Sequence, residues 1–161
     1  MWWFDIMVKG SKGVTLIELM IVIAIIGISA VALIPLGASW VAKTQVEKTQ
    51  KLLVEAYNKA TTEAIKNPNG KLQTDTNPMV AKLTVTNGSG GDDGEITVKT
   101  SDGLTVLWSA KFPAAISVEF LGSTCTDIKL NNNAALIDTT CTGGYTISRS
   151  GISNVTVTAQ L

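Results

Sequence analysis

"KGSKGVTLIELMIVIAIIGISA", residues 9–30, decides the architecture of this chain. Lys9 and Lys12 lead into an apolar run from Val14 to Leu36, which three polar residues interrupt: Thr15, Glu18 and Ser29. As a helix this run would span about 34 Å, close to the roughly 30 Å hydrocarbon core of a bilayer. Because the lysines precede the run, we expect the N-terminus to stay in the cytoplasm and the remainder to be translocated.

Glu18 is the residue that a simple membrane anchor does not explain. A secretory signal peptide fits poorly, because its apolar region is shorter and ends at a small-residue cleavage site. A plain signal anchor remains an alternative, but a carboxylate costs about 2.5 to 3.5 kcal/mol at the centre of a membrane helix, and less near its end. An acidic residue in such a place is a functional candidate that needs a partner.

Proteolysis would supply that partner. Cleavage between Gly13 and Val14 would create an α-amino group, cationic at neutral pH, one helical turn before Glu18. The two charges would pair within one chain or between staggered neighbouring chains, and a matched pair is much less costly than a lone charge in a low-dielectric environment. Glu18 would then fix the register of an assembly.

The stretch "KGVTLIELMIVIAIIGISAVALIP", residues 12–35, closely resembles the N-terminus of type IV pilins and related pilin-like subunits. In that family a membrane peptidase removes a short basic leader after a glycine and methylates the new terminal amine. The resemblance implies cleavage after Gly13, N-methylation of Val14, an assembly role for Glu18 and a helix-kinking role for Pro35. Val14 departs from the Phe or Met of many members, which bears on the subclass.

The resemblance implies a structural subunit rather than an enzyme. It predicts an inner-membrane precursor that prepilin peptidase processes and the pilus machinery polymerises into a helical homo-oligomeric filament on the bacterial surface, for adhesion, motility or DNA uptake. No cofactor and no specific nucleic acid is predicted. The alternatives are a pseudopilin of a type II secretion system, a minor pilin, and, from another class, a signal-anchored ligand-binding domain.

Four segments follow from these patterns: a leader at 1–13, a transmembrane and assembly helix at 14–36, an amphipathic helix at 37–66 and a β-rich head at 67–161. The leader begins at Met1 or at Met7. Pro35 and Gly37 predict a bend or local melting between residues 34 and 37. Beyond it, one apolar stripe predicts core packing, and "NPNG" at 67–70 predicts the helix end; the stripe consists of Leu53, Ala56, Tyr57, Ala60 and Ala64.

The head alternates short apolar runs with turn residues, which predicts strands at 82–86, 95–99, 104–108, 116–120, 145–149 and 155–159. "NGSGGDDG" at 87–94 predicts a hairpin loop. A helix followed by consecutive strands predicts an α+β pilin fold, in which the long N-terminal helix packs on an antiparallel sheet. The expected core residues that face Tyr57 are Leu83, Val85, Ile96, Val98, Val106 and Trp108.

Chemistry-bearing residues are few in this chain. It has no histidine, and its 13 basic and 13 acidic residues cancel. Cys125 and Cys141 favour one disulfide over two buried thiols, because the bulk of the chain is expected outside the cytoplasm. No metal site is predicted; the weak candidate is Asp92, Asp93 and Glu95, for which a solvated acidic turn is favoured over a calcium site. Asn87 and Asn154 fit the common N-glycosylation pattern.

Overall fold

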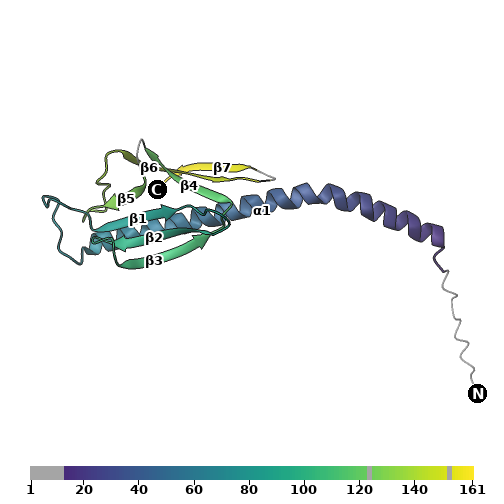
Figure 1. Ribbon diagram of the computed structural model, residues 1–161, viewed down its shortest axis with the longest axis horizontal. Coiled ribbons are helices and arrows are strands. Elements are labelled where there is room, and N and C mark those ends of the chain that lie inside the picture. The colour runs from purple at the N-terminus through teal and green to yellow at the C-terminus, as the bar shows by residue number, and fades with distance from the viewer. Residues whose placement is uncertain (1–12, 123–124, 152–153) are drawn as a thin grey trace, which may run out of the picture. The chain divides into compact units, whose positions relative to one another are not determined.

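The computed structural model describes residues 13–122, 125–151 and 154–161. The expected leader, apart from Gly13, therefore lies outside the described residues. The chain divides into two compact units, Met1–Gly37 and Ala38–Leu161, and each is described by itself. The first unit is the N-terminal part of helix α1 (Leu16–Lys66), and the second contains the rest of α1 and seven strands (Figure 1).

In the second unit, α1 buries one narrow stripe of small side chains. Leu53, Ala56, Ala60 and Ala64 are fully buried, and Tyr57 packs beside them. This confirms the predicted stripe, which the buried residues Ala42, Val46 and Thr49 extend toward the N-terminus. The small side chains let the strands approach the helix closely.

Asn67 ends the helix at the predicted "NPNG" signal. It adopts a positive φ of 43°, and its N–H donates to the carbonyl of Glu63 at 3.1 Å. Its side-chain amide bonds both backbone groups of Lys71, each at 2.8 Å. Asparagine tolerates this left-handed conformation better than most residues, and Pro68 cannot continue the helix.

The strands form two antiparallel sheets, so the fold class is α+β as predicted. Sheet A has the order β3-β2-β1-β5 and sheet B the order β4-β6-β7 (Figure 1). The bounds are β1 Ala81–Thr86, β2 Gly94–Thr100, β3 Val106–Phe112, β4 Ile116–Gly122, β5 Asp127–Leu130, β6 Cys141–Arg149 and β7 Val155–Gln160. The six predicted strands are present, and β1 pairs with β2 across the predicted hairpin loop. The short strand β5 was not predicted.

Both sheets contribute to one core against α1. Leu83, Ile96 and Val98 of sheet A are fully buried as predicted, and Val85 and Trp108 pack partly buried against the same cluster. Val106 was predicted wrongly, since its side chain is 51% exposed. The residues before it form the β2–β3 turn, so β3 begins later than predicted.

Asn87 joins the two sheets where β1 ends. Its side-chain oxygen accepts the N–H of Val118 in β4 at 2.8 Å, and its amide donates to the carbonyl of Val118 at 3.1 Å. The side chain thus bonds the edge of β4 as a neighbouring strand would. Gly88 follows in a tight loop, where a Cβ would lie 2.3 Å from the carbonyl oxygen of Asp92.

Candidate functional site

The first turn of α1 is built by a polar cap. Thr15 precedes the first helical residue, and its hydroxyl accepts the backbone N–H of Glu18 at 3.3 Å. The carbonyl of Thr15 accepts the N–H of Leu19 at 3.1 Å, the hydrogen bond between residues four apart that is typical of an α-helix. The spacing of Thr15 and Glu18 is that of a capping box, in which a hydroxyl at the cap precedes a carboxylate in the first turn. Sequence reasoning missed this role for Thr15, although the Thr-x-x-Glu pattern signals it.

The cap places Glu18 at the end of α1 where the helix dipole is positive. Free backbone N–H groups in a first turn favour a carboxylate, typically by 0.3 to 1 kcal/mol at an exposed site. Glu18 is exposed in this structure, as are Gly13 and Val14. These last two residues precede the helix, so the predicted scissile bond is in irregular, accessible backbone.

The apolar side chains that follow have no partner within the first unit. None of the side chains described between Gly13 and Gly37 is buried, and Leu16, Ile28 and Leu36 are 77%, 76% and 68% exposed. The most apolar window of α1 has a mean hydropathy of 2.8, and by length and composition the helix can cross a membrane. Exposed apolar surface of this extent requires lipid or other protein around it.

Pro35 lies within α1, whose helical backbone is continuous from Leu16 to Lys66. The helix is therefore not melted between residues 34 and 37, and the predicted bend stays a prediction. Proline removes one backbone donor, and the hydrogen bonds of the flanking turns are sufficient to keep the backbone helical.

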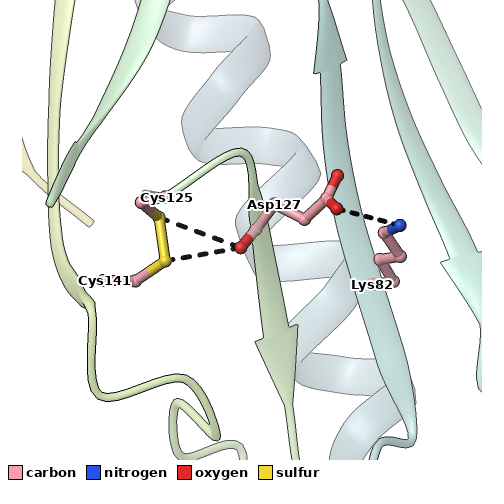
Figure 2. A network of polar contacts seen from close by, with 4 residues as sticks. All are labelled: Lys82, Cys125, Asp127 and Cys141. Carbon is pink, nitrogen blue, oxygen red and sulfur yellow. Dashed lines mark hydrogen bonds and ion pairs between the residues drawn. A yellow bond between two sulfur atoms is a disulfide. The ribbon is translucent and has the colours of Figure 1, made fainter. Parts of the chain in front are cut away.

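Cys125 and Cys141 form the predicted disulfide. The bridge closes a crossover, since the chain leaves sheet B after β4, adds β5 to the edge of sheet A and returns to sheet B at β6. The carbonyl oxygen of Asp127 contacts both sulfur atoms, at 3.8 Å and 3.5 Å (Figure 2). Disulfide sulfurs carry no proton, so these are close contacts rather than hydrogen bonds.

The carboxylate of Asp127 links β5 to β1 through an ion pair. Its Oδ2 lies 2.9 Å from Nζ of Lys82 in β1, and both side chains are partly exposed, Lys82 by 28% and Asp127 by 16% (Figure 2). The ion pair and the strand pairing between β1 and β5 attach the crossover to sheet A. The disulfide joins the two ends of the crossover beside sheet B. Sequence reasoning missed the ion pair, because nothing in the local pattern relates Lys82 to Asp127.

The acidic candidates for a metal site lie in and beside the β1–β2 loop. Asp92 and Asp93 are exposed, and Glu95 lies in β2 opposite Lys111 of β3. Among residues 13–122, 125–151 and 154–161, no group of three or more acidic, cysteine or histidine side chains is arranged to hold a metal ion.

Residues 8–34 match the family model described as the prokaryotic N-terminal methylation motif. This motif is the type IV prepilin signature. The match includes the cap, Glu18 and most of the exposed apolar run, so the N-terminal part of the chain is similar to that of type IV prepilins. Neither a curated protein nor a solved structure matches the chain. The head is thus described by its own structure alone.

Proposed function

We propose that this pilin-like protein is a structural subunit of a type IV pilus. The observation that carries the proposal is the exposed apolar surface of α1 within the methylation motif, with one carboxylate in its first turn. As a precursor the chain would lie in the inner membrane with its head on the outer side. Prepilin peptidase would cut between Gly13 and Val14 and methylate the new terminus.

Assembly would transfer the apolar helix from lipid to neighbouring subunits. This exchange yields little hydrophobic free energy, because lipid tails are as apolar as the side chains, so packing and charge pairing must select the register. The pairing of Glu18 with the α-amino group of Val14, in the same or a neighbouring subunit, would supply that selection. The pilus assembly machinery would supply the work of extraction.

The head supports a filament subunit over a pseudopilin of a type II secretion system. Its disulfide-closed crossover, residues 125–141, resembles the C-terminal disulfide loop of filament-forming pilins. A calcium loop in the head, for which Asp92, Asp93 and Glu95 are the candidates, would instead favour a pseudopilin. A minor pilin at the filament tip is a close variant of the same proposal.

The test replaces Glu18 and leaves the rest of the helix unchanged. We expect Glu18→Ala to insert in the membrane normally and to lose its leader, but to yield few filaments in electron micrographs of sheared cell surfaces. Glu47→Ala is the matched control, because Glu47 is an exposed carboxylate of the same helix, 4.0 Å from Lys43. Wild-type filament yield from Glu18→Ala would contradict the pairing.

Mass spectrometry of the mature N-terminus tests the signal-anchored alternative, and electron microscopy of filaments tests the pseudopilin. We expect a chain that begins at a methylated Val14. A chain that retains its leader would instead support a signal-anchored ligand-binding domain, and filaments absent from wild-type cells but formed on overproduction would support a pseudopilin.

A further inference from the structure

Trp40 has a position on α1 that the packing of the head does not explain. Its side chain is 71% exposed, whereas Trp108, the other tryptophan among the described residues, packs partly buried against the core. At about 100° per residue, Trp40 projects about 160° away from the buried Ala42, on the opposite face of the helix. A large indole that faces away from the core needs another environment.

The packed part of α1 in the second unit begins directly after Trp40. Ala42 is the first fully buried residue of the second unit, and Gln45 accepts the Nε–H of Arg149 in β6 at 2.9 Å. Further along α1, Gln50 donates to the hydroxyl of Tyr145 at 3.1 Å. A membrane therefore cannot extend along α1 beyond this point without covering the polar contacts of the head.

The spacing of Trp40 from the start of α1 fits the thickness of a bilayer. From Leu16 to Trp40 a helix rises about 36 Å, between the roughly 30 Å of the hydrocarbon core and the 40 to 45 Å that includes the headgroups. Tryptophan prefers the headgroup level, because its ring is apolar and its N–H needs a polar partner. Lys43, whose side chain is 71% exposed, follows one turn later and can reach lipid phosphates.

We propose that Trp40 binds the lipid headgroup layer at the outer surface of the inner membrane and sets the depth of the precursor. With Trp40 fixed at this level, the first turn of α1 lies at the cytoplasmic surface, where the bond between Gly13 and Val14 is available for cleavage. Trp40 is thus a positioning residue for processing. The depth of Trp40 stands on its exposure and spacing, while its effect on cleavage rests on the proposed function.

The depth is measured by fluorescence quenching on the full chain. Trp2, Trp3 and Trp108 are replaced by phenylalanine, and the protein is placed in phosphatidylethanolamine–phosphatidylglycerol vesicles with bromine at a shallow or a deep position on the acyl chains. We expect shallow bromines to quench Trp40 severalfold more than deep ones. A matched protein that retains only Trp108 should show no quenching. Stronger quenching of Trp40 by deep bromines, or none at all, would overturn the proposal.

A second pair of variants tests positioning. Trp40→Tyr keeps an aromatic ring with a polar group, whereas Trp40→Leu keeps only apolar bulk. We expect leader removal in pulse-labelled cells to be near wild type for Trp40→Tyr and severalfold slower for Trp40→Leu. Equal rates for all three proteins would reject the positioning role. The quenching result needs neither cleavage nor filaments, so failure of the pilus proposal would leave it interpretable.

Discussion

Glu18 is a charged residue whose cost the first turn of α1 offsets in part. The cap by Thr15 and the helix dipole offset part of this cost, typically by 0.3 to 1 kcal/mol. A carboxylate deep in a membrane costs about 2.5 to 3.5 kcal/mol, so the cap suffices only while Glu18 lies near the bilayer surface. In a fibre the same residue would be surrounded by protein, and a counter-ion becomes necessary.

Hydrogen bonds lower the pKa of Asp102 and of Asp138 in the second unit. The Thr100 hydroxyl, and then the backbone N–H groups of Leu104 and Thr105, donate to the Asp102 carboxylate and hold its pKa below the usual value. Asp138 is held low in the same way by the hydroxyl and N–H of Thr140. A depressed pKa contributes stability that is complete above the unfolded pKa of about 3.9 and is lost as pH falls through the lower folded pKa.

We therefore predict that the head is less stable to urea at pH 3 than at pH 7, and that Asp102→Asn reduces this difference. The amide keeps an acceptor oxygen, but its hydrogen bonds lack the charge assistance of a carboxylate, so the variant should be modestly less stable at pH 7. Asp92→Asn, which removes the same charge from the β1–β2 loop, is the control. If the stability of Asp102→Asn changed with pH as much as that of the wild type, the Asp102 carboxylate would not contribute to the pH dependence.

At the scale of elements, the crossover through β5 depends on the disulfide more than on the ion pair. Closing a loop between residues 16 apart in sequence is worth about 3 kcal/mol in the chain-entropy model. A partly exposed ion pair contributes about 1 kcal/mol or less. The four residues of β5 bury Ile128 and Leu130, which are too few to hold the crossover without one of these constraints.

We predict that replacing Cys125 and Cys141 together by alanine lowers the free energy of unfolding by about 3 kcal/mol. Replacing both avoids a lone buried thiol. Lys82→Ala should cost about 1 kcal/mol, since it removes the partner of Asp127 but leaves the loop closed. Urea unfolding followed by tyrosine and tryptophan fluorescence measures both. A larger loss from Lys82→Ala than from the double variant would reverse this ranking.

The elements also show what could be predicted from local sequence. Strands with period-two alternation and the stripe of α1 were predicted because each pattern is several residues long. β5 was missed because "DIKL" is short and gains its place only by pairing with β1, which is distant in sequence. The start of β3 was misplaced because the carboxylate of Asp102 and the positive φ of Gly103 extend the turn into an apolar run. The ion pair of Lys82 and Asp127 likewise depends on tertiary pairing.

At the scale of the whole molecule, the second unit buries apolar side chains, whereas the first unit exposes them. The buried hydrophobic residues all lie at or after Ala42, whereas the apolar side chains described in the first unit are exposed. The core of the second unit is thus complete without the described residues of the first unit, 13–37. Removal of those residues takes away surface that needs lipid or neighbours and no buried contact.

We predict that residues 38–161 alone form a soluble, folded monomer without detergent, with a single cooperative urea transition and the disulfide intact. Size-exclusion chromatography with light scattering gives the mass, and circular dichroism gives the transition. The full chain is the comparison, and it should require detergent or lipid, because its apolar helix surface remains exposed. If residues 38–161 did not fold alone, the first unit would contribute to the core. Filaments formed by the head alone would mean that assembly does not depend on the apolar helix or on Glu18.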